Sequence, residues 1–253
     1  MSKPVLITGA SGYLGGFVVQ ALAGAAPLRL FDRVPPASLP PGADFRSGDI
    51  ADLAGVEDAM QGCGAVVHLV ALVRGRQQRS LDDFAKVMVQ GTWNVFEAAV
   101  RCQVERVVNC SSIVAGRFRG DRRNRVSDPP EYSAGDLRYA LSKTLGEEIG
   151  RAYHVAHGLP VVHIRPGVIA GDGVNADPRA PDKPAGLWFL YVDPRDAAAA
   201  IVRALAPDAP AYGTFAVVAD RPDSTIDLTP TREQLGYRPQ FNWPDIPVTE
   251  RRP

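Results

Sequence analysis

The chain has 253 residues, of which 45% are hydrophobic and 22% charged, so it can bury a sizeable core and is not disordered as a whole. Its 28 basic and 28 acidic residues give a formal net charge of zero, which excludes a generally basic nucleic-acid-binding protein but allows a local cationic patch. No apolar run approaches the ~20 residues of a membrane-spanning helix, and a strand-like segment begins too early to leave room for a signal peptide.

The cysteines are three in number, and their positions fit neither a disulfide framework nor a metal site: Cys63, Cys102 and Cys110. The four histidines are scattered as well, so we expect no metal. Reduced thiols are typical of the cytoplasm. We therefore expect a cytoplasmic protein whose partners include neither nucleic acid nor membrane.

Short apolar runs alternate with longer helix-like stretches, a pattern typical of a parallel sheet with helices on both faces. We therefore predict an α/β fold with a doubly wound parallel sheet. The expected strands are Val5–Thr8, Leu28–Phe31, Asp44–Arg46, Ala65–Leu69, Arg106–Cys110, Pro160–Arg165 and Gly213–Ala219. The expected helices are Tyr13–Ala23, Leu53–Met60, Leu81–Arg101, Ser133–His157 and Pro194–Ala206.

A glycine-rich segment from Thr8 to Gly15 follows the first expected strand and opens the first expected helix. Gly9 permits a tight turn there, and Gly12 lets backbone N–H groups approach a pyrophosphate. Gly15 lets the helix pack closely on the strand, and the start of that helix adds N–H donors and partial positive charge. The segment therefore predicts a sheet of the Rossmann type that binds a dinucleotide.

Two aspartates lie at the ends of the next two expected strands. Asp32 follows the glycine segment by about 20 residues, where it can accept hydrogen bonds from the adenosine ribose. Asp49 can receive the adenine amino group. Because the Asp32 carboxylate repels a 2′-phosphate, the sequence favours NAD over NADP, although the neighbouring Arg33 could accommodate that phosphate.

A tyrosine and a lysine lie four residues apart in the long helix expected over Ser133–His157, and so on one face of it. The Lys143 ammonium, together with an oxidised nicotinamide, favours the phenolate and would lower the pKa of Tyr139 from ~10 towards that of a general base. Ser111 and Ser112 follow the fifth strand, at the sheet edge where ligands of such folds bind. A serine there can hold the reacting oxygen while Tyr139 exchanges its proton.

With these motifs, the chain resembles the short-chain dehydrogenase/reductase (SDR) superfamily, and within it the extended branch, the NAD-dependent epimerase/dehydratase family. The resemblance runs through nearly the whole chain. Beyond the motifs above, it rests on Asp49-Ile50, His68-Leu69, Gly91-Thr92-Trp93-Asn94-Val95, Arg165-Pro166-Gly167, Tyr191-Val192-Asp193 and Leu235-Gly236-Tyr237-Arg238-Pro239.

The resemblance implies a role for each matching residue. Tyr139 would be the base, Lys143 would bind the nicotinamide ribose, and Ser112 would complete the catalytic set. Cofactor contacts are implied for Gly9, Ser11, Gly12, Tyr13, Leu14, Gly15, Asp32, Arg33, Asp49, Ile50, Leu69, Val70, Ala71, Tyr139, Lys143 and Pro166. The substrate would contact Val73, Arg74, Ser111, Ser112 and Arg179.

The same resemblance implies a division of the chain and a partner. Residues 1–166 would form the NAD-binding domain with the catalytic serine, tyrosine and lysine, and residues 167–253 a small substrate-binding lobe packed on the same unit. The expected helices Leu81–Arg101 and Ser133–His157 match those that form a dimer interface in relatives, so a homodimer is implied.

The chain departs from the family pattern at three places. Met88 stands where the family usually has asparagine, so one supporting polar contact should be missing. The segment that begins Ser111-Ser112 is one residue shorter than the common form, which leaves the choice between the two serines open. Val70 replaces a small residue and should narrow the site.

Two observations bear on the substrate. The part of the chain after Pro166 is short, which suggests a substrate smaller than a nucleotide-linked sugar. Arginine forks match carboxylate and phosphate groups, and arginines gather after the fourth and fifth strands, which favours an anionic substrate. These arginines are Arg74, Arg76, Arg79, Arg117, Arg119, Arg122, Arg123 and Arg125.

A short lobe and an anionic substrate together resemble the uronate dehydrogenases of this branch. In such an enzyme Tyr139 would deprotonate the anomeric hydroxyl of a sugar acid while a hydride passes to NAD, and Arg179 would bind the carboxylate. One alternative is a nucleotide-sugar 4-epimerase or dehydratase with a recycling NAD. Another is a dinucleotide sensor without catalysis, which the presence of Ser112, Tyr139 and Lys143 together disfavours.

Overall fold

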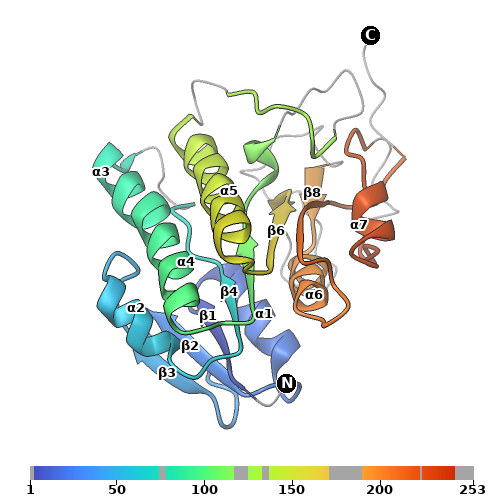
Figure 1. Ribbon diagram of the computed structural model, residues 1–253. Helices are drawn as coiled ribbons and strands as arrows, with labels where there is room; N and C mark the ends of the chain where they lie inside the picture. The colour runs from blue at the N-terminus through green and yellow to red at the C-terminus, as the bar shows by residue number, and fades with distance from the viewer. Residues whose placement is uncertain are drawn as a thin grey trace.

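The computed structural model describes residues 3–73, 78–116, 125–132, 137–170, 190–222 and 224–242. Within them, seven parallel strands form one twisted sheet (Figure 1). These strands are β1 (Val5–Thr8), β2 (Leu28–Asp32), β3 (Asp44–Ser47), β4 (Ala65–His68), β5 (Arg106–Cys110), β6 (Val161–Pro166) and β9 (Tyr212–Val217). Their order across the sheet is β3-β2-β1-β4-β5-β6-β9. This arrangement confirms the predicted doubly wound Rossmann-type fold.

The central strands are buried on both faces. Every residue of β1, β4 and β6 is buried, which explains why these strands are rich in apolar residues without an alternation of apolar and polar positions. Strand β3 lies at the edge, and there Arg46 and Ser47 are exposed. Because the strands are parallel, their carboxyl ends at Thr8, His68 and Cys110 lie along one edge of the sheet.

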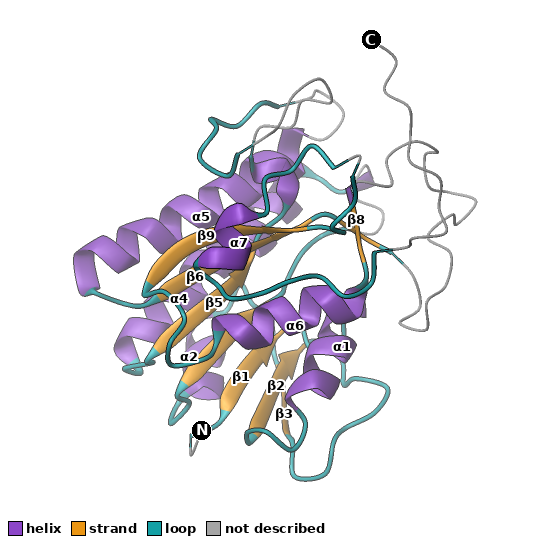
Figure 2. Ribbon diagram, turned by 90° about the vertical axis from the view of Figure 1, so that its right-hand side faces the viewer, coloured by secondary structure: helices purple, strands orange, loops and turns teal. Residues whose placement is uncertain are grey.

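Helices cover both faces of the sheet (Figure 2). On one face α1 (Tyr13–Leu22) packs against α6 (Pro194–Ala204). On the other face lie α2 (Leu53–Met60), α4 (Gly91–Arg101) and α5 (Leu137–His157). Each layer encloses its own cluster of buried apolar side chains, so the sheet separates two cores.

The expected helix Leu81–Arg101 is helical throughout but not uniform. It begins with α3 (Leu81–Asp83), where Ser80 and Asp83 form a capping box. A π-helical segment (Phe84–Gln90) follows before α4 begins. The apolar period of the sequence cannot reveal the extra residue per turn, because the helical stretch as a whole still buries one side.

The part of the chain after Pro166 returns to the main sheet. Strand β9 pairs with β6, so this part supplies the last strand of the sheet and helix α6. It also forms a two-stranded sheet of β7 (Val168–Ile169) and β8 (Tyr191–Val192), and the short helix α7 (Thr229–Glu233), none of which the sequence patterns revealed. The domain boundary at residue 166 stays a prediction.

The described residues also bear on membranes and thiols. No helix among them has both the length and the apolar character needed to cross a membrane. The three cysteines all lie in the described part of the chain as free thiols, and Cys63 and Cys110 are buried.

Candidate active site at the carboxyl edge of the sheet

The glycine-rich segment forms a tight turn between β1 and α1. Gly9 has φ +76°, and a Cβ there would lie 2.9 Å from the Val70 backbone nitrogen. A Cβ at Gly15 would lie 2.5 Å from the carbonyl oxygens of Gly9 and Ala10. Glycine is therefore required at both positions. At position 9 the backbone is left-handed and lies close to Val70, and at position 15 the helix packs directly on the turn.

The first turn of α1 faces this segment. Gly12 caps the helix and supplies no side-chain hydrogen bond, so the N–H groups of the first turn are not satisfied by their own cap. Tyr13 is exposed and Leu14 half-buried, and Ser11 directs its hydroxyl to the Val34 carbonyl at 2.5 Å. The uncapped N–H groups at the start of α1 lie next to the tight glycine turn, and such an arrangement can bind a pyrophosphate. The residues present therefore fit a dinucleotide.

The Asp32 carboxylate is held at the end of β2 by two backbone donors. The Ser11 N–H donates to Oδ2 at 3.0 Å and the Arg33 N–H donates to Oδ1 at 2.7 Å. These bonds fix the carboxylate next to the glycine turn and leave lone pairs for ribose hydroxyl groups. The geometry thus brings together the two halves of the predicted cofactor site.

The adenine side of the site lies after β3. Asp49 Oδ1 accepts from the Ala51 N–H at 2.9 Å, and the Asn94 amide donates to the Ile50 carbonyl at 3.0 Å. Asn94, within the family-like Gly-Thr run, therefore anchors this loop to α4. In the sequence, Asn94 stands out only as part of the family-like run, and its anchoring role becomes visible only in the fold.

The tyrosine and lysine both lie on the buried side of α5, one turn apart. Tyr139 is 9% exposed, and Lys143 Nζ lies 6.0 Å from the centre of its ring. Lys143 Nζ also donates to the Cys110 carbonyl oxygen at 2.6 Å, which ties α5 to the end of β5. Burial lowers the pKa of Lys143, while nearby Cys110 and Glu147 oppose that shift.

The two adjacent serines have different surroundings. Ser111 is 2% exposed, and its hydroxyl donates to Glu147 Oε1 at 2.5 Å. Ser112 begins the short 3₁₀ turn Ile113–Ala115, and among the described residues its Oγ has one long contact, of 3.5 Å, with the Val114 N–H. The Ser111 hydroxyl is thus engaged in a short hydrogen bond, whereas the Ser112 hydroxyl is better able to bind a substrate oxygen.

A largely enclosed ion pair, which the sequence patterns did not reveal, lies behind the serines. Arg165, at the end of β6, binds both carboxylate oxygens of Glu147, with Nε to Oε1 at 2.7 Å and Nη2 to Oε2 at 2.6 Å. The Arg165 Nη1 donates to the Val126 carbonyl at 3.0 Å. A signal was available: Glu147 follows Lys143 by four residues, on the same buried side of the helix.

A second missed network runs beneath the glycine turn. His68 at the end of β4 lies between the hydroxyls of Thr8, at 2.7 Å, and Thr92, at 3.1 Å. Because Thr92 donates to the Met88 carbonyl, its oxygen accepts from His68 Nε2, and Nδ1 then accepts from Thr8. Burial, with the charge of Lys143, lowers the pKa of His68 to about 3, so the imidazole is neutral.

Met88 does not leave the gap that the family pattern implied. Its Sδ accepts from the Leu72 N–H at 3.2 Å, so a sulfur takes up a backbone donor in the wall of the site. Met88 also packs with Phe84 and Tyr139 in a small apolar cluster. The expectation of a missing polar contact is therefore corrected.

Other expected contact residues lie where the sequence placed them, at or just beyond strand ends. Leu69, Val70, Ala71 and Val73 follow β4, and Pro166 ends β6. Arg79 and Arg125 are both exposed. The remaining arginines considered for substrate binding lie outside the described residues: Arg74, Arg76, Arg117, Arg119, Arg122, Arg123 and Arg179.

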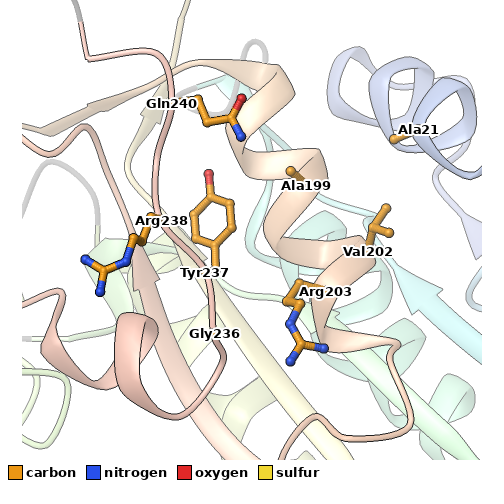
Figure 3. A pocket seen from close by; sticks show the side chains of 8 residues that line it. All are labelled: Ala21, Ala199, Val202, Arg203, Gly236, Tyr237, Arg238 and Gln240. Carbon is orange, nitrogen blue, oxygen red and sulfur yellow. The ribbon is translucent and has the colours of Figure 1, made fainter.

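A separate cavity of about 550 Å³ lies away from these residues, between α1, α6 and residues 236–240 (Figure 3). Arg203 and Arg238 both line it, but their guanidinium groups point apart in the close-up and do not converge on one point. Arg203 instead pairs with Asp208. Among the described residues no group of histidines, cysteines and carboxylates could hold a metal ion.

The glycine turn, the fixed carboxylate at the end of β2 and the paired tyrosine and lysine define a dinucleotide-dependent enzyme with a Rossmann-type sheet. Residues 5–190 match the NAD dependent epimerase/dehydratase family, and the chain belongs to that family. The predictions of an extended SDR enzyme and of NAD as its cofactor are thereby confirmed.

The similar proteins include sugar dehydrogenases that align over almost the whole chain. NAD-dependent glucose-6-phosphate dehydrogenase of Haloferax volcanii is 28% identical over 96% of this chain and 95% of its own. L-arabinose 1-dehydrogenase (NAD(P)(+)) of the same organism is 29% identical over 94% of this chain and 96% of its own. The solved structure of glucuronic acid dehydrogenase from Chromohalobacter salexigens has a TM-score of 0.79 at 25% identity, over 95% of this chain and 85% of that chain. These similarities agree with the predicted likeness to sugar-acid dehydrogenases.

Proposed function

We propose that the protein is an NAD-dependent dehydrogenase that oxidises a hydroxyl group of a sugar or sugar acid, with Tyr139 as its general base. The observation that carries this proposal is the position of Lys143, which lies beside the Tyr139 ring and is bound to the end of β5. Ser112 follows Cys110 by two residues, which supports its assignment to one catalytic set with Tyr139 and Lys143.

In this mechanism NAD, when bound, accepts the hydride, and the chain's own residues handle the proton. The Tyr139 phenolate oxygen takes the proton of the substrate hydroxyl, while the Ser112 hydroxyl holds the same oxygen. The charge of Lys143 favours the phenolate over the phenol. The Cys110 carbonyl keeps the ammonium in place, and burial around the pair excludes water.

We assign the cofactor to the glycine turn and to the carboxylate at the end of β2. The turn at Gly9 and the start of α1 would hold the pyrophosphate, and Asp32 would hold the ribose of the adenosine. Asp32 next to bound NADP would face a 2′-phosphate of like charge, so we assign a preference for NAD.

We further propose that the substrate carries a negative charge. Support comes from the arginines that follow β4 and β5, and from two of the similar enzymes, a glucose-6-phosphate dehydrogenase and a glucuronic acid dehydrogenase, whose substrates are anionic. The arabinose enzyme is the counterexample, since its sugar is neutral. Arg74 and Arg179 are the arginines that we assign to the anion.

The test is NADH formation from galacturonate, glucuronate, glucose 6-phosphate, arabinose and glucose, each with NAD and with NADP. We expect turnover with an anionic sugar and NAD. Equal rates with neutral and anionic sugars would contradict the anionic substrate but not the dehydrogenase. Tightly held NAD and no NADH from any free sugar would favour the alternative, a nucleotide-sugar epimerase or dehydratase.

We also propose that the protein is a cytoplasmic homodimer joined through the outer faces of α4 and α5. Large apolar side chains exposed on these two helices include Trp93 at 55%, Leu141 at 41% and Leu145 at 40%. Substitution Leu141→Glu would place charge in that interface. Light scattering should then report a dimer for the wild type and a monomer for the variant, whereas a monomeric wild type would contradict the proposal.

A further inference from the structure

Among the described residues, Glu147 and Arg165 form the most enclosed ion pair that connects two different elements. Their side chains are 12% and 10% exposed, and the guanidinium binds the carboxylate through two parallel bonds. The Ser111 hydroxyl adds a third bond to Glu147. We call Ser111, Glu147 and Arg165 the Glu147 cluster.

Such a pair is a poor way to gain stability. Removing two charges from water costs about as much as their attraction returns, and apolar residues of similar volume often serve equally well. The Glu147 cluster, in contrast, connects three elements: the end of β5, the end of β6 and the middle of α5. We therefore infer that its role is to align these elements with one another.

The elements it joins carry the proposed reaction. Glu147 lies one helical turn beyond Lys143, which itself lies one turn beyond Tyr139. Ser111 is the immediate neighbour of Ser112. The third donor of Arg165 holds the Val126 carbonyl and so fastens the segment 125–132 to the same edge.

Ser112 has little to hold it by itself. Within the described part of the chain, its hydroxyl has one contact, which it accepts from the Val114 N–H at 3.5 Å, so we infer that its position depends on the backbone that precedes it. That backbone is fixed by Ser111, whose N–H donates to the Ile164 carbonyl at 2.7 Å and whose hydroxyl binds Glu147.

We propose that Glu147 and Arg165 are positioning residues that, through Ser111, set the place of the Ser112 hydroxyl relative to Tyr139. This inference rests on the proposed function, because that function assigns Ser112 and Tyr139 to the reaction. Ser111 then belongs to the support of the site and does not itself contact the substrate. A misplacement of about 1 Å in such a pair can lower a rate by about 100-fold.

The experiment compares Ser111→Ala, Glu147→Gln and the double variant Glu147→Gln with Arg165→Met. The single Glu147→Gln leaves a buried guanidinium without its counter-charge and is expected to unfold more easily. The double variant removes both charges and should regain much of that stability. The matched control is Glu148→Gln, which removes the same charge from the next residue of α5, in a solvent-exposed pair with Arg151.

We expect kcat to fall about 10-fold in Ser111→Ala and about 100-fold in the double variant, with NAD affinity within about threefold of the wild type. The control should keep its kcat. A double variant that regains kcat together with its melting temperature would show that the pair is merely structural and would overturn the proposal.

A crystal structure of the double variant keeps the two proposals separable. If the wild type oxidises no sugar, the proposed function fails, yet the position of Ser112 relative to Tyr139 can still be compared between the variant and the wild type. A displaced Ser112 hydroxyl supports the positioning role, and an unchanged one contradicts it.

Discussion

The Lys143 ammonium donates a hydrogen bond of 2.6 Å to the carbonyl oxygen of Cys110, the last residue of β5. This bond connects the helix that carries Tyr139 with the strand that leads to Ser111 and Ser112. Because it is buried, it also fixes where the charge of Lys143 lies relative to the phenol.

Substitution Tyr139→Phe removes the proposed base and leaves the ring that packs with Phe84 and Met88. General-base catalysis is worth about 10²–10⁴-fold, so kcat should fall by that order while NAD binding persists. Steady-state NADH formation and a fluorescence titration with NAD measure the two quantities. The control is Tyr153→Phe, which removes another hydroxyl of α5 that binds Glu97 and Trp93 on the outer side. Wild-type turnover in Tyr139→Phe would remove the tyrosine from the mechanism.

The choice of cofactor should depend on the charge of Asp32. Substitution Asp32→Asn keeps the size of the side chain and removes the repulsion of a 2′-phosphate, so the preference for NAD over NADP should shrink by about 10-fold or more. The ratio of kcat/KM with the two cofactors is the measurement. Asp58→Asn makes the same change of charge on the exposed side of α2 and should leave the ratio unaltered. An unchanged ratio in Asp32→Asn would assign the preference elsewhere.

Two neighbouring glycines of α1 offer a matched pair. A Cβ at Gly15 meets two carbonyl oxygens at 2.5 Å, whereas a Cβ at Gly16 meets nothing within 4 Å. Gly15→Ala should therefore push the helix from the turn, with weaker NAD binding and a loss of about 1–3 kcal/mol of stability. Gly16→Ala should raise the unfolding free energy by about 0.5–1 kcal/mol, since alanine favours the helix. Thermal melts with and without NAD check both, and equal effects would contradict the close packing.

Local patterns were sufficient for the parts of the site that lie within one short segment. The glycine turn with Gly9 and Gly15 can be predicted because its spacing reflects one strand–turn–helix unit. Tyr139 and Lys143 can be predicted because a spacing of four places both on one helix face. In each case the residues that cooperate are close in sequence.

The rest depends on residues far apart in the chain. Nothing in a spacing rule pairs Glu147 with Arg165, or gives the Leu72 N–H to the sulfur of Met88, because those contacts exist only once α5, β6 and the π-helical segment are packed. The family pattern even suggested the opposite for Met88. Patterns within a single segment therefore cannot predict the parts of the site that depend on tertiary packing.

Two buried histidines should make the fold sensitive to acid. Burial lowers the pKa of His163 from 6.5 to about 4, with Arg165 adding to the shift and Glu147 opposing it, and His68 behaves alike. The Asn109 amide donates to His163 Nδ1 at 3.0 Å, which requires that nitrogen to be unprotonated. Between pH 6.5 and about 4 the unfolded chain therefore binds protons that the folded chain does not, so stability falls as the pH falls through this window.

For His163 alone, the loss between pH 7 and pH 5 should be about 2 kcal/mol. Substitution His163→Gln offers Asn109 a carbonyl oxygen without a titrating group, so the unfolding free energy should depend less steeply on pH by that amount. Urea unfolding from pH 7.5 to 5 measures the slope. His157→Gln, on the exposed end of α5, is the control and should keep the wild-type slope. If His163→Gln kept the wild-type slope as well, the acid sensitivity would have to come from other groups, with the buried imidazole of His68 the first candidate.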